Sequence, residues 1–94
     1  MILKEIIDVI EKWAPVENAE DFDNVGLLVG DPSINVNKAL ITIDTLENVI
    51  DEAIENNCDL IISFHPIIFA GLKKLTQETY VERVVKKAIK NDIN

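Results

Sequence analysis

Apolar residues recur at helical spacing in three stretches of the chain and gather into short runs in three others. The helical spacing predicts amphipathic helices at about residues 2–13, 46–57 and 79–91. The short runs, bounded by glycine, proline, aspartate or asparagine, predict strands at about residues 26–29, 39–43 and 59–64. We therefore expect an α/β fold with a small mixed sheet.

The middle of the chain predicts a βαβ unit. Strand 39–43, helix 46–57 and strand 59–64 follow one another closely, so the two strands should be parallel and the crossover right-handed. The connection between strands 26–29 and 39–43 is short, which favours antiparallel pairing. The last two residues, Ile93 and Asn94, look like the start of a further strand.

The first and last predicted helices indicate which side chains are buried. Trp13 lies in phase with Leu3 and Ile6, so we expect it to anchor the core rather than contact a partner. The last helix should turn an apolar stripe inward and a basic stripe toward solvent. The apolar stripe contains Tyr80, Val81, Val84, Val85, Ala88 and Ile89, and the basic stripe contains Arg83, Lys86, Lys87 and Lys90.

Composition fits one small domain, residues 1–94. The chain is 48% hydrophobic and carries a net charge of -8, which disfavours nucleic acid and anionic membrane as partners. Its most apolar window, residues 60–72, is interrupted by His65 and Pro66 and is too short to span a bilayer. Cys58 is the only cysteine, so no internal disulfide is expected. The acidic residues near the N-terminus argue against a signal peptide, and the expected location is the cytoplasm.

Charge is divided unevenly along the sequence. The first 59 residues hold 14 acidic and three basic side chains, whereas residues 60–94 hold three acidic and six basic ones. We interpret this division as a sign of a charged cleft or a subunit contact.

The only histidine, His65, follows the predicted strand 59–64 and precedes Pro66, which ends that strand. Asp44 follows strand 39–43, so both side chains should lie at the edge of the sheet where ligands of α/β proteins bind. Asp44 has three candidate roles: an oxygen ligand of a metal, a general base, or an ordinary helix N-cap. His65 is either a hydrogen-bonded structural residue or a metal ligand. The N-terminus of helix 46–57 should favour an anion at the same edge.

One histidine and one aspartate do not complete a metal site, because zinc and iron sites with open positions usually take at least three protein ligands. We therefore expect the 94-residue chain alone to bind metal weakly and to be inactive. The sequence contains neither the G-x-S-x-G motif of serine hydrolases nor the G-x-x-x-x-G-K motif of P-loop proteins.

Three motifs together resemble the beginning of the NIF-three-like family, many of whose members carry the name GTP cyclohydrolase 1 type 2 homologue. These motifs are residues 22–32 (FDNVGLLVGDP), Ile43-Asp44, and residues 65–73 (HPIIFAGLK), and the resemblance covers the whole chain. It implies an α/β protein with a dinuclear centre of zinc, iron or manganese, often assembled as a toroidal hexamer. The chain would correspond to roughly the first third of a member.

The resemblance also implies site residues. Family members place two adjacent histidine ligands before the proline; here only the second matches, as His65, and Phe64 replaces the first. Asp44, Asp23 and Asn24 are candidates for an accessory role at the site. The remaining family ligands, an aspartate, a histidine and a glutamate, have no counterpart in this sequence.

Two functions remain open. The first is a metal-dependent hydrolase acting on a nucleotide-like or phosphate-bearing substrate, in which metal activates water. The second is a non-enzymatic metal-binding or scaffold protein that acts through assembly or a protein partner. Phe64 favours this second function or a one-metal variant of the first. In either case we expect a homo-oligomer, formed through the sheet edge or through an apolar face near Phe64 on which Ile61 and Phe69 are also partly exposed.

Overall fold

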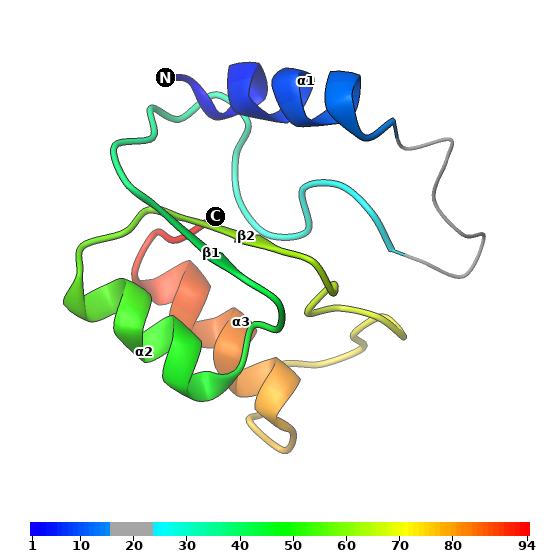
Figure 1. Ribbon diagram of the computed structural model, residues 1–94. Coiled ribbons are helices and arrows are strands. Elements are labelled where there is room, and N and C mark those ends of the chain that lie inside the picture. The colour runs from blue at the N-terminus through cyan, green and yellow to red at the C-terminus, as the bar shows by residue number, and fades with distance from the viewer. Residues whose placement is uncertain (16–23) are drawn as a thin grey trace.

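The computed structural model describes residues 1–15 and 24–94 and confirms the expected α/β fold (Figure 1). Helix α1 lies on one side of a sheet, and two further helices lie on the other side. No helix in the described part of the chain is long and apolar enough to cross a membrane. In chain order the elements are α1 (Leu3–Trp13), β1 (Ala39–Thr42), α2 (Glu47–Glu55), β2 (Leu60–Ser63) and α3 (Tyr80–Lys90).

The sheet is the predicted parallel pair. Leu40 lies opposite Ile61 and Thr42 opposite Ser63, and β1 pairs only with β2 among the described residues. The ladder continues past both strand ends, with the Asp59 N–H donating to the Lys38 carbonyl and the Phe64 N–H to the Thr42 carbonyl. These extra bonds explain why the predicted strands were one or two residues longer than the observed ones.

The other edge of β2 is paired by Asn94. The Asn94 N–H donates to the Asp59 carbonyl at 3.0 Å, and the Ile61 N–H donates to the Asn94 carbonyl at 2.8 Å. This alternation about Leu60 is the hydrogen-bond pattern of a parallel ladder. The expectation that Ile93 and Asn94 begin a further strand agrees with this pairing.

The predicted strand at 26–29 is wrong, because residues 24–30 form no strand. The described edge of β2 is taken by Asn94, so this segment contributes side chains instead: Leu27 packs beside α1, and Val29 packs beside α2 and α3. The antiparallel bridge in this region joins Ile2 to Asn35 instead.

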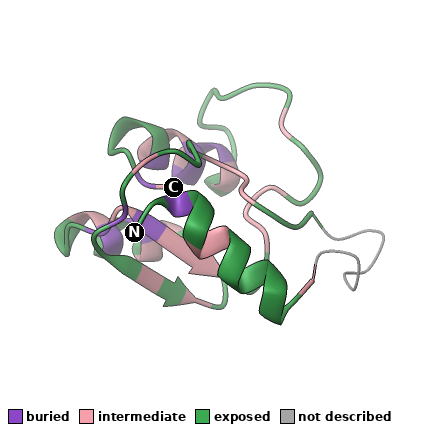
Figure 2. Cartoon of the chain, turned by 90° about the horizontal axis from the view of Figure 1, so that it is seen from above, coloured by how far each residue is buried: buried purple, intermediate pink, exposed green. Residues whose placement is uncertain are grey.

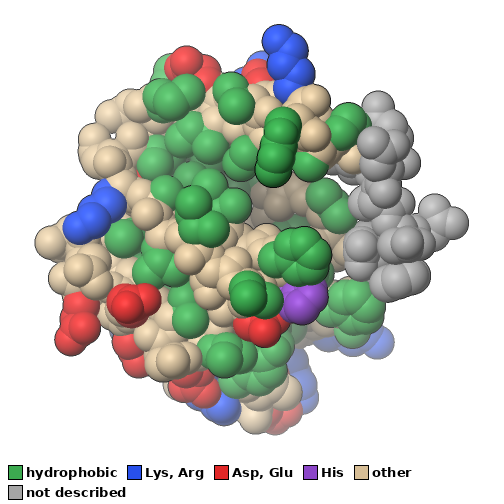
Figure 3. Space-filling view, viewed as in Figure 1, with side chains coloured by type: hydrophobic (Ala, Val, Ile, Leu, Met, Phe, Trp, Pro, Cys, Tyr) green, Lys and Arg blue, Asp and Glu red, His purple; other side chains and the backbone are tan. Residues whose placement is uncertain are grey.

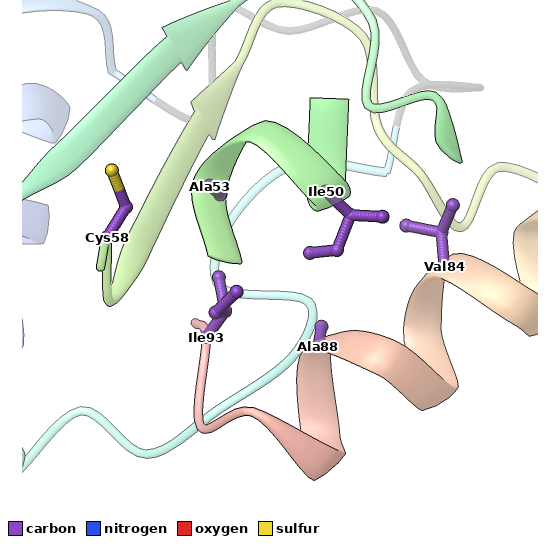
Figure 4. Packing of buried hydrophobic residues seen from close by; sticks show 6 residues of the cluster. All are labelled: Ile50, Ala53, Cys58, Val84, Ala88 and Ile93. Atoms are coloured by element: carbon purple, nitrogen blue, oxygen red, sulfur yellow. The ribbon is translucent and has the colours of Figure 1, made fainter. Parts of the chain in front are cut away.

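Two clusters of buried side chains fill the space on either side of the sheet. In the first, Ile50 of α2 and Val84 of α3 point toward each other, with Ala53, Ala88, Cys58 and Ile93 around them (Figure 4). In the second, Leu3, Val36 and Leu60 join α1 to the sheet. The sheet is therefore covered by helices on both faces, which holds the strand ends in place.

The prediction that Trp13 anchors the core is wrong, because its side chain is 89% exposed. Burial falls along α1, from Leu3 at 1% exposed to Ile10 at 37% (Figure 2). Trp13 lies in phase with the apolar stripe, but the second half of α1 extends beyond the residues that cover its first turn.

Helix α3 is held to α2 by apolar contacts and by ion pairs. Arg83 pairs with Glu47 and Lys87 pairs with Asp51, at 2.8 and 2.7 Å. The basic stripe of α3 is thus not simply solvated. Part of the excess of basic residues in the second part of the sequence forms ion pairs with acidic residues of the first part. Val84, Val85 and Ala88 are buried as predicted, whereas Tyr80 and Ile89 are exposed at the margins of the stripe.

Candidate functional site

Asp44 and His65 lie side by side just beyond the carboxyl ends of β1 and β2. The parallel register pairs Thr42 with Ser63, and just beyond the strands the His65 N–H donates to the Ile43 carbonyl at 2.9 Å. The imidazole Nδ1 of His65 is 2.6 Å from Oδ1 of Asp44. The prediction that these side chains share one edge of the sheet on neighbouring parallel strands is confirmed.

Two equivalent hydrogen bonds from side-chain hydroxyls fix the backbone of Asp44 and His65, each of which lies two residues after the end of its strand. The Thr42 Oγ1 donates to the Asp44 carbonyl at 3.0 Å, and the Ser63 Oγ donates to the His65 carbonyl at 2.8 Å. Each hydroxyl belongs to the last residue of its strand and fixes the backbone two residues later. Neither contact was predicted, although the repeated order of a hydroxyl residue, an apolar residue and the site residue is visible at positions 42–44 and 63–65.

The helix N-cap role considered for Asp44 is wrong. The N-cap of α2 is Leu46, and no side chain caps this helix. The carboxylate of Asp44 instead contacts His65, and both side chains are about half exposed, at 52% and 58%. The pair is therefore open to a ligand.

Phe64 shapes the surroundings of His65. The two rings meet edge to face, with centroids 5.0 Å apart and an interplanar angle of 67°. Phe64 is 82% exposed, Ile41 of β1 is 79% exposed, and Ile43, just after β1, is 66% exposed. Apolar side chains are therefore exposed on and beside the two strands that carry the candidate site.

Asn24 contacts the loop that follows His65, whereas Asp23 falls outside the described residues. The Asn24 Nδ2 donates to the Ile68 carbonyl at 2.6 Å, which ties Asn24 to the loop after His65. Asn24 and His65 also line one cavity of about 530 Å³ between α1 and β2. Figure 3 shows the surface hollowed there, with the purple histidine at the rim.

His65 fits a divalent metal as one donor, because an imidazole nitrogen suits zinc or iron. Within residues 1–15 and 24–94, however, no group of three or more histidine, cysteine, aspartate or glutamate side chains could hold an ion. Asp44 is the one acidic side chain that contacts His65 there, and one of its oxygens is already engaged by the ring. The described residues thus offer one candidate donor, His65, and no complete set of metal ligands.

The chain resembles known proteins along its whole length. The model of the family Duf34/NIF3 (NGG1p interacting factor 3) matches residues 1–94. A GTP cyclohydrolase 1 type 2 homolog of Clostridium acetobutylicum is 45% identical over 92 residues, which cover 98% of this chain and 34% of the relative. NIF3-like protein 1 of Bos taurus is 40% identical over 94 residues, 25% of its length.

Solved structures agree with these sequence matches. The crystal structure of Staphylococcus aureus protein SA1388 superposes with a TM-score of 0.95 at 37% identity, over 100% of this chain and 27% of that one. Reduced HcgD from Methanocaldococcus jannaschii gives a TM-score of 0.90 at 33% identity, over 99% of this chain and 37% of its own. The chain spans about a third or less of the length of the curated relatives described above. By the match of the family model to every residue and by these relatives, the chain belongs to the Duf34/NIF3 family.

Proposed function

We propose that the intact protein is a metal-dependent hydrolase of a nucleotide-like or phosphate-bearing substrate, with His65 as one metal ligand. The observation that carries the proposal is the position of the imidazole, held through Nδ1 by Asp44 at the carboxyl edge of the parallel strands. No side chain in the described part of the chain bonds to its Nε2, which leaves this nitrogen available to a ligand. Relatives named GTP cyclohydrolase 1 type 2 homolog support a nucleotide-like substrate.

A bound divalent cation would supply an activated water, because it lowers the pKa of that water toward neutrality. The residues of this chain would bind the cation and orient the substrate. His65 offers a nitrogen ligand, and the cavity whose rim it shares is lined largely by apolar side chains. The N-terminus of α2 lies at the same edge of the sheet, without a side-chain cap, and favours a negatively charged substrate group.

The remaining ligands are expected from the part of the intact protein that the relatives possess and this chain does not cover. The test is metal analysis and GTP turnover of the full-length protein, purified as wild type, as His65→Gln and as Lys90→Gln. Lys90 is exposed at the end of α3 and serves as a matched surface change. We expect His65→Gln to lose at least tenfold in zinc affinity and in turnover, and Lys90→Gln to behave as wild type. A wild-type protein that neither retains nor takes up zinc, iron or manganese would contradict the proposal.

The exposure of Phe64, together with Ile41 and Ile43, favours a second candidate function. These three side chains are among the most exposed large apolar residues of the chain, and such a surface suits a subunit or protein contact. In this alternative the protein acts as a metal-binding scaffold that assembles as a homo-oligomer. Analytical ultracentrifugation of Phe64→Ser distinguishes the two candidates. The scaffold role predicts dissociation at unchanged metal content, whereas the hydrolase role alone predicts an unchanged assembly.

A further inference from the structure

We propose that Asp44 is the positioning residue of His65: it fixes the imidazole in the tautomer that carries hydrogen on Nδ1 and so directs Nε2 toward the metal, without binding the metal itself. The inference rests on the proposed function, in which His65 is a metal ligand. It assigns to Asp44 a role different from the oxygen ligand, the general base and the helix cap considered from the sequence.

The contact between the two side chains determines the direction of the hydrogen bond. An ionised carboxylate only accepts hydrogen bonds, so Nδ1 of His65 must be the donor across the 2.6 Å that separate it from Oδ1 of Asp44. In a neutral imidazole one ring nitrogen donates and the other accepts. With the hydrogen held on Nδ1, the lone pair is on Nε2, the nitrogen that is free of partners among the described residues.

The geometry of the ring separates Asp44 from a metal on Nε2. The two nitrogens flank one carbon of the five-membered ring and their bonding directions diverge in the ring plane, so an ion on Nε2 would lie away from the carboxylate on Nδ1. Carboxylates in this position are a recurrent feature of metal-binding histidines, where they fix the ring orientation and raise the basicity of the ligand. Asp44 thus acts on the metal through His65.

The backbone holds both partners in register before any ligand arrives. The hydroxyls of Thr42 and Ser63 fix the carbonyls of Asp44 and His65, and the His65 N–H is bonded to the neighbouring strand. On the other side the Phe64 ring meets the imidazole edge to face. Because α2 does not use the Asp44 carboxylate as a cap, that side chain has His65 as its partner.

The first test reads the tautomer directly in the metal-free, full-length protein. Long-range ¹H–¹⁵N spectra of histidine-labelled protein distinguish the two tautomers, and the His65 signals are identified by their loss in His65→Gln. We expect hydrogen on Nδ1 of His65 in wild type and in Asp8→Asn. This control variant removes one negative charge from an exposed carboxylate of α1. Asp44→Ala should shift His65 toward the form with hydrogen on Nε2. An unchanged tautomer in Asp44→Ala would overturn the inference.

The second test measures zinc affinity by competition with a chromophoric chelator. Loss of an outer partner of a metal-bound histidine typically weakens affinity about 10–100-fold, and we expect that loss in Asp44→Ala. Asp44→Asn keeps a side-chain oxygen that can accept from Nδ1, so it should restore most of the affinity. An Asp44→Asn variant as weak as Asp44→Ala would show that an oxygen accepting from Nδ1 does not restore the affinity, and would overturn the positioning role.

His65→Gln separates this inference from the function on which it rests. If His65→Gln binds zinc weakly but Asp44→Ala binds as tightly as wild type, the metal role of His65 stands and the positioning role is overturned. If His65→Gln binds zinc as tightly as wild type, the proposed metal role fails and the inference fails with it. Weak binding by both variants, together with the tautomer change, supports the positioning role.

Discussion

Ile50 should be among the most sensitive positions of the core. Its side chain is 0% exposed and lies between Val84, Ala53 and Ala88, where α2 and α3 meet (Figure 4). Ile50→Ala removes three carbon atoms, which at about 0.8 kcal/mol each gives roughly 2.4 kcal/mol of lost transfer free energy. The two alanines nearby have no side-chain freedom to fill the space, so a cavity term adds to this loss. We expect a total of about 3–4 kcal/mol in the free energy of unfolding.

Urea denaturation followed by circular dichroism measures this loss. With a slope of about 1–3 kcal/mol per molar urea, a loss of 3 kcal/mol moves the midpoint down by roughly 1–3 M at unchanged slope. Ile89→Ala is the matched control, because it removes the same atoms from a side chain that is 55% exposed on α3. We expect the control to stay within about 0.5 kcal/mol of wild type. A loss in Ile50→Ala no larger than that of Ile89→Ala would refute the packing described for the two helices.

Two further predictions concern single polar contacts, and a third concerns the exposure of Trp13. The Thr76 N–H and other donors outweigh the opposing effect of burial and lower the pKa of Glu82. Its carboxylate therefore stabilises the fold above about pH 4.3, and this stabilisation is lost as the pH falls through the lower pKa of the folded state. The free energy of unfolding of Glu82→Gln should depend less on pH in that window, and acid unfolding profiles equal to those of wild type would contradict the prediction. Lys87→Met should cost at most about 1 kcal/mol in urea unfolding, because the pair with Asp51 is largely exposed, and a cost that does not shrink at about 1 M salt would exclude an ionic origin. Trp13 should be quenched by acrylamide almost as fully in the folded protein as in urea, and marked protection in the folded state would contradict its exposure.

Local patterns in the sequence predicted most of the fold. The three helices and the parallel pair were expected within one or two residues of their observed ends, because amphipathic spacing and short apolar runs depend on neighbouring residues. The contact between Asp44 and His65 was predictable for the same reason, since each follows a strand of one βαβ unit. The capping box of Thr79 and Glu82 at the start of α3 also has a signature in the sequence, a threonine followed three residues later by a glutamate.

The failures involve contacts between distant segments. Periodicity placed Trp13 on the correct face of α1 but gave no information on how far the covering residues extend. Glycines and apolar residues at 26–29 are compatible with a strand, but which segment pairs with β2 depends on Asn94, far away in the sequence. The candidate site shows the same division. The position of His65 followed from the end of the predicted strand, whereas the hydrogen bond from Asn24 to the loop after His65 joins segments that no local pattern connects.

The long-range hydrogen bonds of Asn94 have a consequence for the order of folding. Its side chain accepts from the Asp31 N–H and donates to the Asp59 carbonyl, partners 63 and 35 residues away along the chain. Gly30 lies so close that an added Cβ would overlap the Asn94 side chain. Closing such long loops costs entropy that the local contacts of the βαβ unit do not offset, so we expect these long-range contacts of Asn94 to form after the rate-limiting step of folding. Weakening them with Asn94→Ala should then accelerate unfolding in stopped-flow measurements and leave the refolding rate nearly unchanged, which makes Asn94 a determinant of how long the native state lasts rather than of how fast it is reached.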